Sequence, residues 1–418
     1  MYNDDMNINQ KIEEIVKKVE KKQKIEQKDI NFIINSYVNE KISDDEILPF
    51  IKAIYNFGLD NESLFYLTDA MKNSGEILNL ESLKRCVDKH STGGVSDTTT
   101  IIIVPILAEL GTKILKLSGR SLGFTGGTCD KLESFMGYQT DLDLNKAIEL
   151  TQKNGGCMIT SSKNIAPADK KIYALRDRTG LVDSIPLIAS SIMSKKLATN
   201  ADILILDVKY GNGAFMKSKK DAEKLGKIMK NIGKFAKKEV KITYGKMNQP
   251  LGYNVGPKLE CMEAIDVLKG NQCNSLLYKE SVKLASLCYS LDKKIPYVFA
   301  KIKVIKCIKS GRALEKLKQI VLSQGGNLDL FKLEYSYPTL KVTAESSGKI
   351  CGFNTQKIGE IIAKLNFENK DNSLGIRTFV KIGDKIKAKD NLFYVYAKDL
   401  TQAEKIKNLV NECIFIKK

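Results

Sequence analysis

A cation, an imidazole, several hydroxyls and two glycines stand together in residues 88–100, between two apolar stretches. The segment reads Asp-Lys-His-Ser-Thr-Gly-Gly-Val-Ser-Asp-Thr-Thr-Thr. Glycines let backbone N–H groups turn toward an anion, and the hydroxyls and the lysine ammonium supply further donors. This chemistry suits an oxyanion such as phosphate. A single glycine-rich turn, however, is more often only a tight connection between a strand and a helix.

Residues 118–133 form a second segment of this kind, Ser-Gly-Arg-Ser-Leu-Gly-Phe-Thr-Gly-Gly-Thr-Cys-Asp-Lys-Leu-Glu. Each of the two segments follows a short run typical of a strand. Two donor-rich turns after two strands of one sheet can face a single pocket. The pair therefore favours an anion site over two unrelated connections.

The elements that must position these segments change in kind along the chain. From Ile12 the apolar residues recur with the spacing of a helix that buries one face. Ser43 and Glu46 form a capping-box sequence that opens a helix, which we expect to end at Gly58. Another helix is predicted to end near Gly75. About the first 75 residues are thus predicted to form a small all-helical domain.

After Val87, β-branched runs at 101–104, 203–206 and 240–243, which we expect to be strands, alternate with helical stretches. This alternation predicts a larger α/β domain with a buried central sheet. Short strands dominate from about 334, which predicts a C-terminal α+β module. The fold class is therefore multi-domain α/β, and the predicted domains are 1–75 plus 165–199, 80–164 plus 200–333, and 334–418.

Composition excludes several functional classes. Of the 67 basic residues only six are arginine, and the lysines are mixed with acidic residues, which indicates solvated helix faces rather than nucleic-acid binding. No apolar run is long enough to span a membrane, and the N-terminus lacks a signal pattern, so we expect a cytoplasmic protein without membrane association. Because His90 is the only histidine, a metal site of thiols and imidazoles is not supported.

The glycine-rich segments together resemble the signature of the pyrimidine-nucleoside phosphorylase family, which includes thymidine phosphorylase. K-H-S-T-G-G-V is followed by S-G-R-x-L-G-x-T-G-G-T-x-D-K-L-E-S. The resemblance extends from about Ile12 to the C-terminus and is weakest in the last third. It continues through residues 166–177, 184–196, 211–216 and 249–253.

The resemblance implies reversible phosphorolysis in pyrimidine salvage. Orthophosphate attacks the anomeric carbon of a pyrimidine nucleoside and releases the free base and a pentose 1-phosphate. No cofactor is required for this chemistry. The resemblance also implies that the helical domain binds the base and forms a homodimer, that the α/β domain binds phosphate, and that cleft closure brings the reactants together.

Matched to the family, the substrate contacts form three groups. His90 would donate a hydrogen bond or a proton to a pyrimidine oxygen. The base contacts, with Arg176 and Lys195 also catalytic, fall on Arg176, Ser191 and Lys195. Ser191 and Lys195 are spaced to share a helix face. The phosphate contacts fall on Lys89, Ser91, Thr100, Lys116, Leu117, Ser118 and Thr128.

Broad-specificity members of the family also hold a structural potassium ion. Carbonyl, hydroxyl and carboxylate oxygens suit such a hard cation. The matching positions are Ser96, Thr98, Leu251, Asn254 and Glu263. An ordinary exposed helix carboxylate is the alternative for Glu263.

Four positions depart from the family pattern. Ser96 and Ser121 replace glycines, Phe124 replaces a histidine, and Tyr210 replaces a small hydroxyl residue. The aromatic replacements leave the preference among thymidine, deoxyuridine and uridine open, and Ser96 is strained if its turn needs a positive φ. Two rivals to the phosphorylase reading remain: an anthranilate-type phosphoribosyltransferase and an inactive nucleoside-binding homologue.

Overall fold

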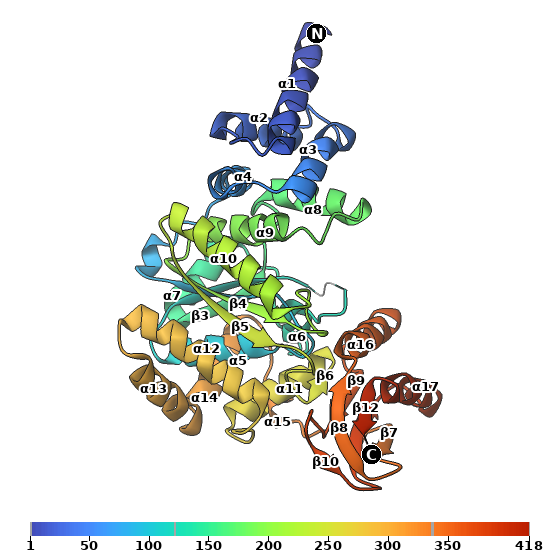
Figure 1. Cartoon of the computed structure of the whole chain (residues 1–418). Helices are drawn as coiled ribbons and strands as arrows, with labels where there is room; N and C mark the ends of the chain where they lie inside the picture. Colours follow the sequence, from blue (N-terminus) through green and yellow to red (C-terminus); the bar gives the residue numbers. More distant parts are fainter. Residues whose placement is uncertain (1, 121–122, 336–337, 418) are drawn as a thin grey trace. The chain divides into compact units, whose positions relative to one another are not determined.

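The chain folds into two compact units, which are described separately. The computed structural model describes residues 2–120, 123–335 and 338–417. Unit 1 contains 1–81, 162–204 and 220–242, and unit 2 contains 82–161, 205–219 and 243–418 (Figure 1). The finer division into three domains stays a prediction.

Unit 1 is built from helices. Ser43 and Glu46 form the expected capping box at the start of the third helix, and Gly58, at φ 75°, caps its end. Because the apolar stripe of each helix is buried, the helices pack into a common core. The helices are α1 (Tyr2–Glu20), α2 (Gln27–Val38), α3 (Asp44–Phe57), α4 (Asn61–Asn73), α8 (Pro167–Arg178), α9 (Ile185–Ala198) and most of α10 (Lys219–Phe235).

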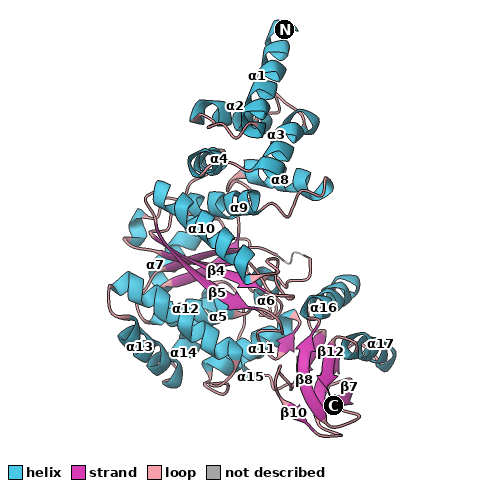
Figure 2. Cartoon of the chain, viewed as in Figure 1, coloured by secondary structure: helices cyan, strands magenta, loops and turns pink. Residues whose placement is uncertain are grey.

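The α/β part of the chain contains five strands between its helices (Figure 2), and the first residues of β4 and β5 belong to unit 1 while the rest belong to unit 2. One sheet has the order β1-β4-β5, β2 pairs with β3 in parallel, and a parallel bridge between Cys86 and Lys113 joins the strands β1 and β2. The strands are β1 (Val87–Ser91), β2 (Ile114–Ser118), β3 (Gly156–Thr160), β4 (Ile203–Tyr210) and β5 (Glu239–Lys246). The helices are α5 (Thr99–Glu109), α6 (Thr128–Leu132), α7 (Leu144–Asn154), α11 (Pro257–Leu268), α12 (Leu276–Lys293), α13 (Tyr297–Lys309), α14 (Arg312–Ser323) and α15 (Asp329–Lys332).

One predicted strand is wrong. The run Ile101–Val104 lies inside the helix α5, whereas the runs at 203–206 and 240–243 lie in β4 and β5. Every residue of α5 from Thr99 to Ala108 is buried. A helix that is buried on all sides has no polar face, so its sequence shows no helical period and its β-branched residues resemble a strand.

The C-terminal part of unit 2 is the predicted α+β module. It is joined to the α/β part by β6 (Asn254–Val255), which pairs antiparallel with β9. Its core includes Val95, Phe124 and Val255 from the α/β part. Its elements are β7 (Leu340–Thr343), β8 (Gly348–Phe353), α16 (Thr355–Asn369), β9 (Gly375–Thr378), β10 (Lys385–Ile386), β11 (Asn391–Tyr396), α17 (Leu400–Asn411) and β12 (Ile414–Lys417).

Across the described residues, the helices are too short or too polar to cross a lipid bilayer.

Candidate active site

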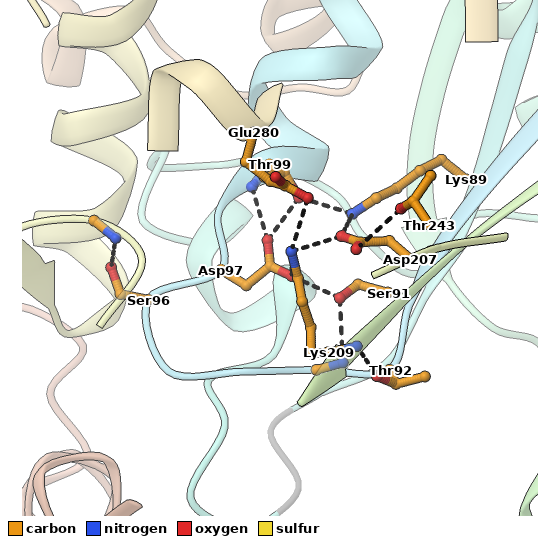
Figure 3. Close-up of polar contacts among 12 residues, drawn as sticks. Lys89, Ser91, Thr92, Ser96, Asp97, Thr99, Asp207, Lys209, Thr243 and Glu280 are labelled. Atoms are coloured by element: carbon orange, nitrogen blue, oxygen red, sulfur yellow. Dashed lines mark hydrogen bonds and ion pairs between the residues drawn. The ribbon is translucent and has the colours of Figure 1, made fainter. Parts of the chain in front are cut away.

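The first glycine-rich segment connects β1 to α5, and a buried lysine begins it. Lys89 is 1% exposed, and its ammonium donates to the Thr99 hydroxyl at 2.7 Å and lies 3.9 Å from the Asp207 carboxylate (Figure 3). The residue that Lys89 contacts is thus Thr99, one position before the predicted phosphate contact Thr100. Thr100 is buried in the next position of the helix.

Asp97 connects the hydroxyl groups of this segment. Its carboxylate accepts hydrogen bonds from the hydroxyls of Ser91 and Thr99, each at 2.6 Å. Ser91 in turn accepts a bond from the Gly93 N–H at 3.2 Å. Burial favours the neutral acid, but the ammonium groups of Lys209 and Lys89 hold the pKa of Asp97 well below its usual range. Asp97 is therefore an anion that fixes the Ser91 and Thr99 side chains.

A second buried lysine balances these carboxylates. The Lys209 ammonium is fully buried and lies 2.7 Å from Asp207, 3.6 Å from Glu280 and 3.9 Å from Asp97 (Figure 3). Burial lowers the pKa of Lys209, but the three carboxylates together raise it above its usual range. Sequence reasoning missed Asp97, Asp207 and Lys209 as site residues, although the alternation of Asp207 and Lys209 on β4 was a usable signal.

The second glycine-rich segment begins at the end of β2, next to β1. Since β1 and β2 are parallel, Ser91 and Ser118 both lie at carboxyl ends of neighbouring strands. The Ser118 hydroxyl is buried and has no hydrogen-bond partner among the described residues. The structure thus brings Ser91 and Ser118 to one sheet edge, and an unpaired buried donor there suits an anion.

The other predicted phosphate contacts surround this edge less directly. Lys116 donates to the Leu117 carbonyl at 2.9 Å and lies 3.6 Å from Asp88, so its ammonium faces a carboxylate within the protein. Leu117 is buried on the opposite face of β2. Thr128 is half-buried and begins α6, whose next residue donates its N–H to the Gly119 carbonyl.

His90 lies on β1 between Lys89 and Ser91 and is partly exposed. Because side chains alternate along a strand, its imidazole projects from the face opposite to Lys89 and Ser91.

The predicted base contacts lie in unit 1, on α8 and α9. The Lys195 ammonium donates to the Ser191 hydroxyl at 3.4 Å, as expected for their spacing, and to the Asp169 carboxylate at 2.5 Å. Ser191 is 8% exposed and the Lys195 side chain 40%. Asp169, which is buried two turns before Arg176 on α8, is a partner of Lys195 that sequence reasoning missed, because the two residues lie on different helices.

Arg176 is almost completely buried at 1% exposure. Its guanidinium donates to the carbonyls of Leu181 at 3.0 Å and Val182 at 2.7 Å, in the connection between α8 and α9. Burial lowers the pKa of Arg176, and the Asp169 carboxylate opposes that shift. Two of its N–H groups thus hold the connection between the two helices.

Three of the predicted potassium positions, Ser96, Asn254 and Glu263, lie together around Gly252 in unit 2. A Cβ atom on Gly252 would lie 2.4 Å from a Glu263 oxygen and 2.7 Å from the Ser96 hydroxyl, so the three residues are in direct contact. Glu263 is fully buried rather than exposed, and it accepts the N–H groups of Tyr253 and Asn254 at 2.7 and 2.9 Å. The Thr98 hydroxyl donates to Glu260 at 2.9 Å.

A buried lysine, Lys381, lies near Glu263. Lys381 donates to the carbonyls of Pro250 and Gly252 at 2.7 and 2.6 Å. Burial raises the pKa of Glu263 and lowers that of Lys381, and their opposite charges counteract both shifts. The Asn254 side-chain oxygen is buried without a partner among the described residues, and Leu251 lies between the carbonyls that Lys381 binds. The oxygen atoms of this set suit a hard cation.

Within the described residues, no cluster of three or more histidine, cysteine, aspartate or glutamate side chains forms a metal site.

The departures from the family pattern have different settings. Phe124 is 9% exposed and packs on Phe215, with ring centroids 5.2 Å apart. Tyr210 is partly exposed at the end of β4. Ser121 lies outside the described residues. Ser96 has a φ of 62°, which confirms the positive φ considered for its turn.

Ser96→Ala is therefore expected to destabilise the protein by about 1 kcal/mol, and Ser96→Gly by less. Both variants lose the hydrogen bond from the Gly252 N–H, at 3.0 Å, but only glycine also relieves the left-handed strain. Denaturant unfolding of the two variants measures the difference. A larger loss in Ser96→Gly than in Ser96→Ala would contradict the strain argument.

Comparisons with known proteins give the family and the fold of this chain. Residues 83–314 match the sequence model of a family described as "Glycosyl transferase family, a/b domain". This range covers both glycine-rich segments and the buried ion network. The fold resembles the crystal structure of anthranilate phosphoribosyltransferase from Thermus thermophilus, with a TM-score of 0.58 and 15% identity over 74% of this chain and 99% of that one. The class defined by fold and site is thus a glycosyl transferase.

Sequence relatives identify the family of this chain within the glycosyl transferases. The chain is 39% identical over 401 residues to a pyrimidine-nucleoside phosphorylase from Bacillus subtilis, which covers 92% of this chain and 91% of the relative. It is 38% identical, with the same coverage, to one from Staphylococcus aureus strain N315. The chain belongs to the pyrimidine-nucleoside phosphorylase family.

Proposed function

We propose that the protein catalyses the reversible phosphorolysis of pyrimidine nucleosides or deoxynucleosides to the free base and a pentose 1-phosphate. The observation that supports this most is the buried Ser118 hydroxyl, which has no hydrogen-bond partner among the described residues and lies at the same sheet edge as Ser91. A separate set of base donors, Arg176, Ser191 and Lys195, fits the second substrate. Orthophosphate and a pyrimidine nucleoside are thus the proposed ligands.

Phosphate is proposed to bind in unit 2. Lys89 and Ser118 supply donors, whereas the Ser91 hydroxyl proton is directed to Asp97. Because this proton is given to Asp97, the Ser91 oxygen is held fixed and can only accept a hydrogen bond, from the P–OH group of a hydrogen phosphate. Such preorganisation lets phosphate be placed for attack on the anomeric carbon without rearrangement of its binding groups.

The departing base is proposed to be stabilised by unit 1. Cleavage of the glycosidic bond places negative charge on the pyrimidine. Lys195 and Arg176 carry positive charge, and their hydrogen bonds to the ring strengthen as that charge develops. His90 donates a hydrogen bond or proton to a pyrimidine oxygen at the same stage.

An absorbance assay for base release tests the proposal directly. Thymidine, deoxyuridine and uridine are each incubated with the protein, with and without phosphate. We expect release that depends on phosphate, with a preference among the three that reflects the aromatic residues Phe124 and Tyr210. Absence of release from all three nucleosides would favour an inactive nucleoside-binding homologue.

Ser118→Ala is expected to raise the phosphate KM about tenfold. A hydrogen bond to a charged group contributes roughly 1.5 to 3 kcal/mol, and this hydroxyl has no partner within the described protein to lose. The melting temperature should therefore stay near that of the wild type. Lys89→Ala should also raise the KM but lower stability, because it leaves Asp207 without one of its two lysines. An unchanged phosphate KM in both variants would show that Ser118 and Lys89 do not bind phosphate.

His90→Asn is expected to reduce turnover about 100-fold while nucleoside still binds. Asparagine keeps a donor but cannot transfer a proton. As His90 is the sole histidine, its imidazole NMR signal needs no assignment, and a pyrimidine base should shift it. An insensitive signal together with normal turnover would restrict His90 to packing.

Three further properties are part of the proposal. The protein is a cytoplasmic homodimer that contacts its partner through unit 1, which sedimentation of the intact chain tests.

A potassium ion, held by Ser96, Thr98, Leu251, Asn254 and Glu263, would add positive charge beside the buried Glu263. A rise in melting temperature in potassium chloride over choline chloride at equal ionic strength is the expected result.

A further inference from the structure

The helix α13 exposes an apolar surface to solvent. Val298, Phe299 and Ile302 are 65%, 60% and 57% exposed. Their spacing places them on one side of the helix, while the opposite side, formed by Ala300, Val304, Cys307 and Ile308, is buried. That buried side accounts for the packing of α13 on α12 and α14 (Figure 1). The exposed apolar side chains are therefore not needed for packing within the unit.

Lysines surround these apolar side chains. Exposed Lys301, Lys303, Lys306 and Lys309 lie on α13, and Lys293 and Lys294 precede it. The sequence contains no aspartate or glutamate between residues 293 and 314. We call the exposed apolar residues and the four helix lysines the α13 patch.

The acidic residues on elements packed against α13 are paired with basic residues. On α12, Asp292 lies 2.9 Å from Lys293, and Glu280 lies 2.7 Å from Lys283. On α5 and α14, the ion pairs are Glu109 with Arg312 and Lys316, and Glu315 with Lys318. The α13 patch therefore has a net positive charge together with its apolar side chains.

We propose that the α13 patch binds the surface of a lipid bilayer that contains anionic headgroups. Phenylalanine and aliphatic side chains can enter the boundary between headgroups and acyl chains, while flanking lysines keep their ammonium groups at the anionic headgroups. A second copy of the chain is disfavoured as the occupant, because two positive patches repel each other. Surface binding of this kind needs no membrane-spanning helix, and it goes beyond the proposed phosphorolysis. It departs from the expectation, drawn from the sequence, of a protein without membrane association.

Vesicle sedimentation of the full chain tests this proposal. We expect the protein to sediment with vesicles that contain phosphatidylglycerol and not with pure phosphatidylcholine vesicles, and to dissociate as salt is added. Lys301→Gln with Lys303→Gln should weaken binding about fivefold for each lysine. Phe299→Ser with Ile302→Ser should weaken it by roughly tenfold, because apolar burial is lost while the charge is unchanged.

A matched control separates the patch from the general basicity of the chain. Lys224 and Lys227 are exposed on α10, and Lys224→Gln with Lys227→Gln removes the same charge from another helix. We expect this control to bind vesicles like the wild type, and all variants to retain base release, which reports an intact fold. The proposal is overturned if anionic vesicles are not bound at low ionic strength, as for a patch that binds only an acidic protein. Equal weakening in the control overturns it as well.

Discussion

Lys195→Ala is expected to lower kcat by about 1000-fold while the KM for phosphate stays near the wild-type value. Lys195 is one of the three proposed base contacts in unit 1, where its ammonium donates to Asp169 and Ser191. An ammonium has three N–H groups, so one remains for the pyrimidine. Its hydrogen bond strengthens as the base becomes negative, and the loss therefore appears in turnover. Steady-state kinetics with each substrate varied in turn measures both constants.

Two variants on α8 control this result. Asp169→Asn keeps an acceptor for Lys195 but removes the charge, so we expect a smaller loss of kcat than in Lys195→Ala. Lys170→Ala, at the exposed neighbouring position, should behave like the wild type.

Arg176→Ala is expected to lower turnover too, but it also leaves the carbonyls of Leu181 and Val182 without these hydrogen bonds, so circular dichroism must accompany it. A phosphate KM that rises as much as kcat falls would contradict the assignment of Lys195 to the base.

Local sequence signals predicted those parts of the fold whose geometry is set within one or two turns. The capping box at Ser43 and Glu46 defines a helix start, and the spacing of Ser191 and Lys195 brings their side chains together. The prediction of a strand at Ile101–Val104 was wrong. The β propensity of these residues favours a strand, but a helix such as α5 that is buried on all sides needs only apolar residues and shows no helical period in its sequence. Tertiary packing decided that element.

The resemblance assigned substrate contacts, which stay predictions, but it did not indicate the charged groups that contact their side chains. Asp97 and Lys209 are more than 100 residues apart, and their ion pair exists only because β4 lies beside β1 in the sheet. Asp169 and Lys195 meet in the same way through the packing of α8 and α9. Charge pairs between distant segments leave no spacing rule in one sequence, whereas pairs within a helix do.

Asp97→Asn is expected to destabilise the protein by about 3 to 5 kcal/mol, because removal of one member of a buried ion network leaves an uncompensated charge. Lys89 and Lys209 are 1% and 0% exposed, and Asp97 and Asp207 balance them. The substitution keeps the side-chain shape, so the loss reports charge rather than packing. Denaturant unfolding near neutral pH measures it, and Asp45→Asn, at an exposed position of α3, is the control expected to change stability by less than about 0.5 kcal/mol.

The pH dependence of this loss separates charge from other effects of the substitution. The pKa of Asp97 is lowered in the folded protein, so its contribution to stability is fully present above the unfolded value of about 3.9 and is lost as the pH falls toward the lower folded pKa. The difference in unfolding free energy between wild type and Asp97→Asn should therefore be constant near neutral pH and shrink below about pH 4. Phosphate KM should rise in the same variant, because Ser91 and Thr99 lose the anion that orients them. A stability difference that persists unchanged into acid would show that the asparagine disturbs packing, and the ion network would then not be what holds the first glycine-rich segment in place.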